Sequence, residues 1–432
     1  MFRQECRWAR VRFAILVDRE QGAGNREQGA SRIRSLLPFP CSLLPLLFPV
    51  LLGAQEPEPP QPSPPLPRAL RVCAGGDITL GTNLDTAWAK MAARRLRTQH
   101  GMSAEPDALI APLRSLFADA DVVILNVETA IGTGRASTKC GRRSKNCYAF
   151  RSPPSAAPAL RSLGDSGVVV VGSVANNHAR DAGDDGMDST IAHLGRAGVL
   201  VTGADTLATP IILPDSTTLA VLGFHTSDIP SDARDLTAVR RHVYRAVEQY
   251  GTVIVTAHIG AEGIGAQRTS DSTEYFLESR IDRGNPVAFA TAAFDAGATL
   301  VVGHGPHVLR AAEWRDDRLV LYSLGNLVTY GPFNNVEPLN RGAVACADIA
   351  GRSVLGAELR PTVQRVPGVV VRDSTARAFS LIDSLSMLDF PWTGARVDSW
   401  GELRRSSMAP ADTARGAHDM PHRARSRTKA RD

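Results

Sequence analysis

Short apolar runs that alternate with amphipathic stretches are the feature that most constrains the fold of this chain. The amphipathic stretches include residues 106–117, 233–249 and 286–296, whose apolar side chains recur at helical spacing. Such alternation is typical of α/β proteins, in which helices cover the faces of a sheet. The apolar runs, which we expect to be strands, are LRVCAGG, DVVILNVE, GVVVVGSVANN, GVLVTG, TLAVLGF, TVIVTAHIG, ATLVVGHGPH, RLVLYSLGN and GAVACADI.

Polar residues follow most of these apolar runs directly. In open α/β sheets, ligands bind outside the carboxyl ends of the strands, so side chains at these positions are expected to share one crevice. The alternative for each single residue is a structural role, because a lone histidine after a strand is usually a hydrogen-bonded core or loop residue. The repetition of the pattern favours a shared site over independent structural roles. The residues concerned are Asp77, Asn126, Glu128, Asn176, Asn177, His178, His258, His304, His307, Ser323 and Asn326.

The chemistry of this set fits a divalent cation. Carboxylates, an amide oxygen and imidazoles together suit Zn, Mn or Fe, whereas calcium prefers oxygen ligands alone. The set contains no thiolate, which disfavours a closed structural zinc site. The sequence therefore predicts one or two divalent metal ions as cofactor.

Six motifs in this order resemble the capsule synthesis protein CapA family, which is associated with poly-γ-glutamate capsules and is related to calcineurin-like metallophosphoesterases. The resemblance covers roughly residues 70 to 330 and implies a four-layer α-β-β-α sandwich of the metallophosphoesterase type. The motifs are GGDITLG from Gly75, NVETAIG from Asn126, ANNHARDAG from Ala175, HIGAE from His258, VVGHGPHVL from Val301 and YSLGNLV from Tyr322.

The resemblance also assigns roles to individual residues. His178 would contact the substrate or leaving group as the catalytic imidazole. Asp181 would orient His178, and its alternative is to cap a following helix. Asn126, Ser323 and Asn326 are candidate substrate contacts, although the SLGN segment also suits a compact turn. The implied metal ligands are Asp77, Glu128, Asn177, His258, His304 and His307.

Two departures from the phosphoesterase pattern lie in this set. Thr79 stands where those enzymes carry a histidine two residues after the first aspartate, and it offers only a neutral oxygen. The segment GHGPH inserts one residue between two histidines that are normally separated by one. Both differences weaken the first-metal position, of which Asp77 is the anchor.

The two ends of the chain differ from its body. Residues 1–54 and residues 401–432 each carry 8 Lys and Arg against 4 Asp and Glu, whereas residues 55–400 carry 33 against 36. The basic pI therefore comes from the ends, and we expect no nucleic-acid partner. We expect a leader over residues 1–54, a Pro-rich linker over 55–69, the CapA-like domain over 70–372, an extension over 373–400 and a disordered basic tail over 401–432.

The apolar segment Leu36 to Ala54 follows two arginines and ends in small residues, as secretory signal peptides do. We therefore expect export to the periplasm or cell envelope, with a retained N-terminal anchor as the alternative. In an oxidising compartment a disulfide between Cys140 and Cys147 is expected. Cys73 and Cys346 lie in apolar runs and are expected to be buried free thiols.

Two functions follow from these expectations. The first is a metal-dependent hydrolase of a phosphoester or a γ-glutamyl amide, in which His178 protonates the leaving group. The second is a non-catalytic envelope protein that binds or guides an anionic capsular polymer, using the metal and basic loops such as Arg142, Arg143 and Lys145. Membrane-bound capsule synthesis machinery is a further expected partner in either case.

Overall fold

The computed structural model describes residues 69–81, 86–135, 148–227, 231–276, 280–331, 333 and 335–406. The predicted leader, nearly all of the predicted linker, Cys140, Cys147 and the basic loop between them lie outside these residues. Most of the predicted tail also lies outside them. Within the described ranges, no helix combines the length and the apolar character that crossing a bilayer requires.

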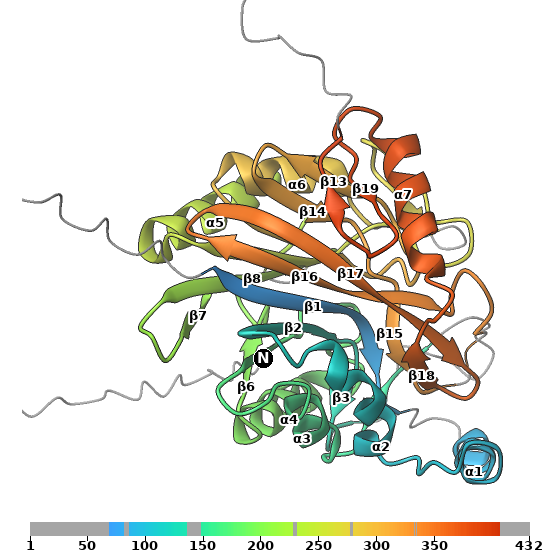
Figure 1. Cartoon of the computed structure of the whole chain (residues 1–432). Helices are drawn as coiled ribbons and strands as arrows, with labels where there is room; N and C mark the ends of the chain where they lie inside the picture. Colours follow the sequence, from blue (N-terminus) through green and yellow to red (C-terminus); the bar gives the residue numbers. More distant parts are fainter. Residues whose placement is uncertain are drawn as a thin grey trace, which may run out of the picture. The chain divides into compact units, whose positions relative to one another are not determined.

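The larger sheet has eight strands and carries β1 near its centre (Figure 1). β1 pairs in parallel with β2 and β15 and antiparallel with β16, and β2, β5 and β6 continue the parallel half of the sheet. Its strands are β1 (Leu70–Thr79), β2 (Val122–Val127), β5 (Val169–Ser173), β6 (Val199–Thr202), β15 (Asn326–Thr329), β16 (Arg341–Ala350), β17 (Ser353–Arg365) and β18 (Val369–Arg372).

The second sheet has six strands in the order β13-β14-β12-β9-β8-β7. β8, β9, β12 and β14 are parallel to their neighbours in this series, and antiparallel strands close both edges. The strands are β7 (Thr209–Ile212), β8 (Thr218–His225), β9 (Val253–His258), β12 (Leu300–His304), β13 (Ala312–Arg315) and β14 (Arg318–Leu321).

The helices fall close to where the sequence predicts them. The stretch at 106–117 forms one α-helical turn continued by a 3₁₀ helix, and the stretches at 233–249 and 286–296 form α5 and α6. The described helical segments are α1 (Thr86–Arg95), a π-helical turn (Leu96–His100), α2 (Pro106–Ile110), the 3₁₀ helix (Ala111–Leu116), α3 (Ala156–Arg161), α4 (Gly183–Arg196), α5 (Leu236–Tyr250), α6 (Pro286–Asp295) and α7 (Arg377–Asp389).

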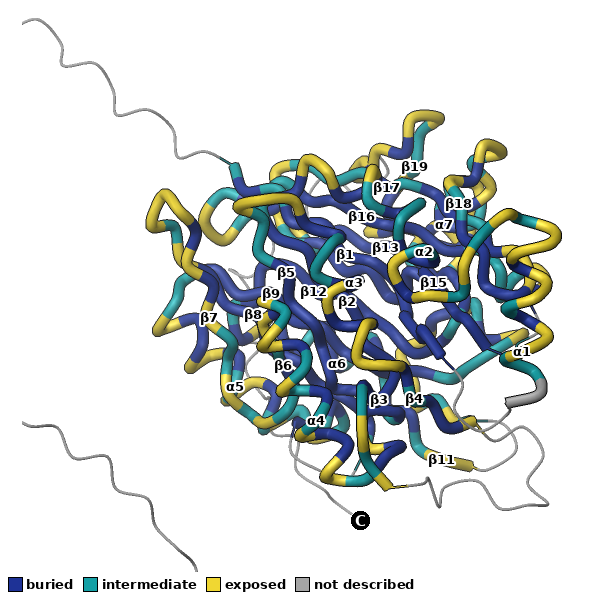
Figure 2. The backbone as a smooth tube through the Cα atoms, turned by 90° about the horizontal axis from the view of Figure 1, so that it is seen from below, coloured by how far each residue is buried: buried dark blue, intermediate teal, exposed yellow. Residues whose placement is uncertain are grey.

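The central strands are continuously apolar because both of their faces are buried. Along β2, Val122 and Ile124 join a core that also contains Ile254 of the second sheet, whereas Val123 and Leu125 join the core beneath α2, α3 and α4. A third core lies between β8, β9 and β12 and the helices α5 and α6. Figure 2 accordingly shows the central strands as buried, with exposure confined mainly to loops and outer helix faces. The predicted α/β class is confirmed.

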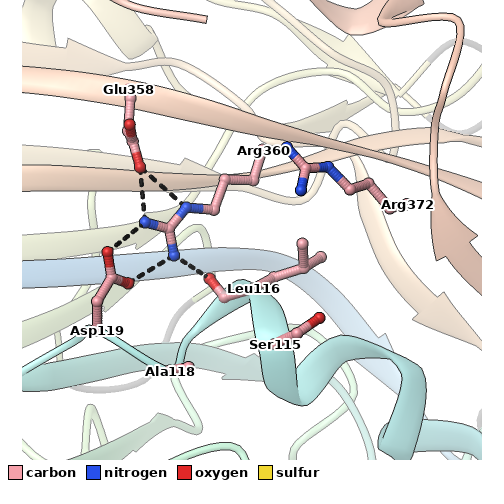
Figure 3. Close-up of a pocket in the computed structure, with 7 residues that line it drawn as sticks. All are labelled: Ser115, Leu116, Ala118, Asp119, Glu358, Arg360 and Arg372. Carbon is pink, nitrogen blue, oxygen red and sulfur yellow. Dashed lines mark hydrogen bonds and ion pairs between the residues drawn. The ribbon is translucent and has the colours of Figure 1, made fainter. Parts of the chain in front are cut away.

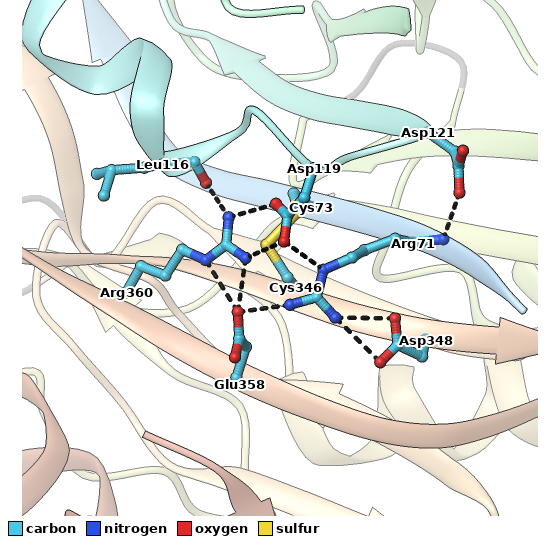
Figure 4. The surroundings of a disulfide bond; sticks show 9 residues. All are labelled: Arg71, Cys73, Leu116, Asp119, Asp121, Cys346, Asp348, Glu358 and Arg360. Carbon is cyan, nitrogen blue, oxygen red and sulfur yellow. Dashed lines mark hydrogen bonds and ion pairs between the residues drawn. A yellow bond between two sulfur atoms is a disulfide. The ribbon is translucent and has the colours of Figure 1, made fainter. Parts of the chain in front are cut away.

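Cys73 and Cys346 form a disulfide, so the prediction of two free thiols was wrong. The two residues lie directly opposite each other on β1 and β16. Because 273 residues separate them along the chain, only the register of these strands brings them together. Figure 4 shows the bond beneath an ion-pair network in which Arg71 and Arg360 share the carboxylates of Asp119 and Glu358.

The C-terminal part of the described chain packs against both sheets. Ala378 and Ile382 of α7 enter the core between the sheets, and Leu385 enters the core of the second sheet. After α7, the strands β19 (Arg396–Val397) and β20 (Leu403–Arg404) form a short hairpin. β20 and its buried residue Leu403 lie inside the range predicted as a tail.

Candidate metal centre

The predicted site residues lie where the parallel strands of the two sheets end. Asp77 is near the end of β1, Glu128 follows β2, and His258 and His304 are the last residues of β9 and β12. Strand pairing sets Asp77 beside Asn126 and Asn326, and sets His258 beside His304. The two sheets therefore contribute opposite walls of one buried site.

Glu128 is the point on which three imidazoles converge. Its Oε1 lies 3.7 Å from Nε2 of His307, 3.8 Å from Nε2 of His258 and 3.9 Å from Nε2 of His178. These separations are too long for hydrogen bonds. They are close to the ~3–4 Å expected between ligand atoms that surround one ion at about 2.0–2.2 Å.

Asp77 is the second anionic group of the site and is fully buried. Its Oδ2 lies 2.9 Å from Nδ1 of His307, and its Oδ1 accepts a hydrogen bond of 2.8 Å from Asn126. The backbone N–H of Gly305 lies 3.3 Å from both carboxylate oxygens. Asp77 is thus held from both sheets.

Close backbone approach at two glycines makes this arrangement possible. A side chain at Gly76 would place its Cβ 2.0 Å from the carbonyl oxygen of Gly325, the group that accepts the N–H of Asp77. A Cβ at Gly305 would lie 2.8 Å from Nε2 of His258. Gly76 of GGD and Gly305 of GHGPH therefore leave no room for a larger residue at the site.

Burial and charge divide the histidines into two kinds. Burial lowers the pKa of His258 well below its usual value and also lowers the pKa of His304, although Asp77 opposes both shifts. Burial likewise disfavours the charged form of His307, but Glu128 and Asp77 outweigh it and raise the pKa of His307 to about 10. Burial would also raise the pKa of Asp77, yet its hydrogen bond with His307 holds that pKa below the usual range.

The donor set fits a divalent metal ion. Ligand atoms of Asp77, Glu128 and His258 lie within 4.8 Å of one another. Among the described residues, Nε2 of His258 and both ring nitrogens of His304 have no hydrogen-bond partner although they are buried. Buried polar atoms normally have a partner, and neutral imidazoles with unused lone pairs are common metal ligands.

His178 and Asp181 form a tightly held pair beside Glu128. Nδ1 of His178 lies 2.6 Å from Oδ2 of Asp181, which also accepts the backbone N–H of Phe150 at 2.7 Å. Ala182, not Asp181, is the N-cap of α4, and no side chain caps that helix. The geometry is that of a carboxylate orienting an imidazole.

Asn177 is half-buried at the rim of the site. Its Nδ2 lies 3.5 Å from Oε1 of Glu262, and the same oxygen forms an ion pair with Arg283. Glu262 therefore links Asn177 to the loop after β9.

The three predicted substrate contacts are all buried and hydrogen-bonded to neighbouring groups. Asn126 donates to Asp77 and accepts from Asn176, at 2.8 and 3.1 Å. Asn326 contacts the ring of His307 at 3.2 Å and donates to its carbonyl oxygen at 3.2 Å. Ser323 accepts the N–H of Gly325 within the SLGN turn.

Thr79 is buried, and its hydroxyl donates to the carbonyl oxygen of Glu128 at 3.2 Å. This hydrogen bond ties the end of β1 to the segment that follows β2. The position that would carry a histidine in the phosphoesterase pattern is therefore used to hold the backbone of Glu128.

A model of the family described as bacterial capsule synthesis protein PGA_cap matches residues 71–330 of this chain. The chain belongs to this family. The match spans every predicted site residue, and it confirms the resemblance to capsule synthesis proteins.

Two relatives of this chain have names that agree with this membership. A "probable polyglutamine synthesis accessory protein" of Mycobacterium tuberculosis is 26% identical over 293 residues, covering 61% of this chain and 75% of the relative. The "PGA biosynthesis protein CapA" of Bacillus subtilis is 28% identical over 188 residues, covering 39% of this chain and 44% of the relative.

A solved structure described as "GAP50 the anchor in the inner membrane complex of Plasmodium" aligns with 73% of this chain and 95% of its own, at 11% identity and a TM-score of 0.35. A score this low supports no conclusion about the fold.

The sequence did not predict a role for two buried arginines near the site of this PGA_cap protein. Arg283 pairs with Glu262, and Arg310 makes two hydrogen bonds to Glu274, at 2.9 and 2.7 Å. Glu274 also accepts the N–H of Ala261. These pairs hold the loop after β9, and because their members are far apart in sequence, no local motif signals them.

A surface pocket of about 410 Å³ lies apart from these residues. Figure 3 shows Arg360 at its centre, bonded to Asp119, Glu358 and the carbonyl oxygen of Leu116. Because the Arg360 guanidinium is already matched by two carboxylates, we assign no ligand to this pocket.

Proposed function

We propose that this capsule synthesis family member is a divalent-metal-dependent hydrolase of a phosphoester or a γ-glutamyl amide. The convergence of three imidazole Nε2 atoms, from His178, His258 and His307, on one carboxylate oxygen of Glu128 carries the proposal. Membership of a capsule and poly-γ-glutamate family supports an anionic polymer or its precursor as the substrate.

The residues that would hold the ion are Asp77, Glu128, Asn177, His258, His304 and His307. When bound, Mn, Zn or Fe at this position polarises the scissile group and makes a water molecule more acidic. The buried neutral His258 and His304 offer lone pairs, while Asp77 and Asn326 fix the ring of His307. We propose one well-held ion, since the Thr79 hydroxyl is already used by the backbone of Glu128.

His178 acts as the general acid in this proposal. Asp181 accepts a hydrogen bond from Nδ1, which fixes the ring and leaves Nε2 directed toward Glu128. Phe150 packs against the ring with centroids 4.2 Å apart, so the imidazole is held on two sides. A proton on Nε2 can then pass to the leaving group as the scissile bond breaks.

We further propose that the domain is a four-layer α-β-β-α sandwich of the metallophosphoesterase type. The core between the two sheets and the separate helix-covered cores on either side support it. The position of the site residues at the carboxyl ends of parallel strands in both sheets also supports this sandwich fold.

Export to the periplasm or cell envelope, with or without a retained N-terminal anchor, is a further part of the proposal. A disulfide between Cys73 and Cys346 supports it, because such bonds persist mainly in oxidising compartments. The names of the relatives support a role for this protein beside a polymer-synthesis machinery. In the envelope this machinery would be membrane-bound.

Metal-dependent turnover tests the proposal. The full-length protein, freed of metal and then reloaded with Mn or Zn, should hydrolyse an aryl phosphodiester or a γ-glutamyl anilide. His178→Ala should lower kcat by about 100- to 10,000-fold, the range expected for loss of a general acid. Asp181→Asn should lower kcat by roughly 10- to 100-fold, because it acts through His178.

His242→Ala on α5 is the matched control, since it removes a histidine from the far side of the second sheet. It should leave turnover and metal content unchanged. Full metal loading and retention of poly-γ-glutamate, without turnover of either substrate class, would reject hydrolysis and favour the non-catalytic polymer-binding alternative.

A further inference from the structure

Three aromatic rings lie next to the proposed general acid. Phe150 contacts the ring of His178, and Phe333 packs edge-on against Phe150 with centroids 5.4 Å apart. Tyr148 completes the cluster, 5.5 Å from Phe333 and 6.2 Å from Phe150. We call Tyr148, Phe150 and Phe333 the aromatic ledge.

The ledge runs outward from the site. Phe150 is 5% exposed and its backbone N–H holds Asp181, so it is fixed to the catalytic pair. Phe333 is partly buried, and Tyr148 is 41% exposed. The cluster thus begins at His178 and ends in a ring that is open to solvent.

The segment after β15 is shaped to bring Phe333 to this place. The N–H of Phe333 donates to the carbonyl oxygen of Gly331 at 2.8 Å, which folds the chain back on itself. A Cβ on Gly331 would lie 2.1 Å from the Phe333 ring. Any other residue at position 331 would therefore push this ring out of its position.

We propose that the aromatic ledge is a binding subsite for the leaving-group side of the substrate, and that this group carries a ring with an apolar face, either a sugar or an aromatic ring. The inference rests on the proposed function, because it takes His178 as the residue that faces the leaving group. A group bonded at the scissile position beside His178 would lie next to this cluster, in which Tyr148 offers the solvent-exposed ring.

The physical basis is stacking. Aromatic pairs contribute about 0.5–1.5 kcal/mol beyond the area they bury, and exposed Tyr148 offers such a face without any cost of opening the core. No charged group is required of the ligand at this end. The charge of the substrate is instead met at the metal centre.

Titration calorimetry tests the subsite without requiring turnover. It measures the binding of phosphonates to the Mn-loaded full-length protein. The probes are ethylphosphonate, benzylphosphonate and a glucosyl methylphosphonate. At least one ring-bearing probe should bind about 3- to 10-fold more tightly than ethylphosphonate. Whichever ring is preferred identifies the source of the leaving group.

Tyr148→Ala should bring that ratio close to one, whereas Tyr148→Phe should retain it because the ring is kept. Tyr244→Ala, which removes an exposed tyrosine from α5, is the control and should retain the ratio. Gly331→Ala should reduce it by displacing Phe333.

Equal affinity for all three probes in the wild-type protein, or a preference that survives Tyr148→Ala, overturns the inference, as does failure of every probe to bind. The outcome is separable from the test of hydrolysis. Ring preference without turnover would refute hydrolysis alone, and turnover without ring preference would refute the subsite alone.

Discussion

Removal of the disulfide between Cys73 and Cys346 should destabilise the protein substantially. The bond closes a loop with a sequence separation of 273 residues. The chain-entropy relation for a loop of this length gives about 5–6 kcal/mol at 25 °C, and measured values for disulfides are typically about 2–4 kcal/mol. We therefore expect Cys73→Ala/Cys346→Ala to lower the free energy of unfolding by about 2–5 kcal/mol.

Urea unfolding of the oxidised wild type, the wild type under reductant and the double alanine variant measures this difference. The variant should unfold at a lower urea concentration, and reductant should shift the wild type toward the variant without affecting the variant itself. Both cysteines are fully buried, so reduction is expected to require prior unfolding. Arg352→Ala, on the exposed turn between β16 and β17, is the control and should change stability by less than about 0.5 kcal/mol.

Two results would refute this reasoning. Free thiols at Cys73 and Cys346, detected by alkylation of the oxidised protein after denaturation, would show that the bond does not form. An intact bond whose removal changes the free energy of unfolding by less than about 1 kcal/mol would show that the unfolded chain is already constrained, so that the loop-closure calculation does not apply.

Three further predictions concern the site and its support. Chelation of the metal should lower the midpoint temperature of thermal unfolding. Mn or Zn at 100 times its dissociation constant should raise the free energy of unfolding by about 2.7 kcal/mol. Identical midpoints with and without metal would contradict metal binding to the native state. Gly76→Ala should lower the free energy of unfolding by about 1–3 kcal/mol and reduce metal content, because its Cβ would lie 2.0 Å from the carbonyl oxygen of Gly325. Gly356→Ala is the control and should be tolerated, because no atom lies within 4 Å of its Cβ. The hydrogen bond from Arg360 lowers the pKa of Asp119 to about 2, so this pair stabilises the fold above about pH 4 and the effect is lost as the pH falls toward 2. Because the Asp119 side chain is 51% exposed, Asp119→Asn should lower the free energy of unfolding by only about 0.2–1 kcal/mol at pH 7. Unfolding measured at decreasing pH should show the stabilities of the wild type and the variant converging near pH 2.

The sequence predicted the elements well because strand and helix signals are local. β2 and β9 are buried along their whole length and begin with consecutive apolar residues, and this pattern can be recognised from a few neighbouring positions. The position of Asp77 and of His258 at strand ends follows from the same signal.

Roles within the site were harder to predict, because a side chain's partner is set by distant segments. Asn326 and Asn126 are predicted to contact substrate, and no local pattern indicates that their amides also hold His307 and Asp77. The choice between orienting His178 and capping α4 was likewise open for Asp181 until its hydrogen bonds were known.

The sequence by itself determined the family, the α/β class and the residue types that end each strand, since these depend on short-range patterns and on motif order. Only the tertiary structure decided which cysteines pair, how three imidazoles meet at Glu128 and which aromatic rings stand beside His178. The physical reason is the same in each case. Strand register and sheet packing bring together residues such as Cys73 and Cys346 whose separation along the chain carries no information about their distance in space.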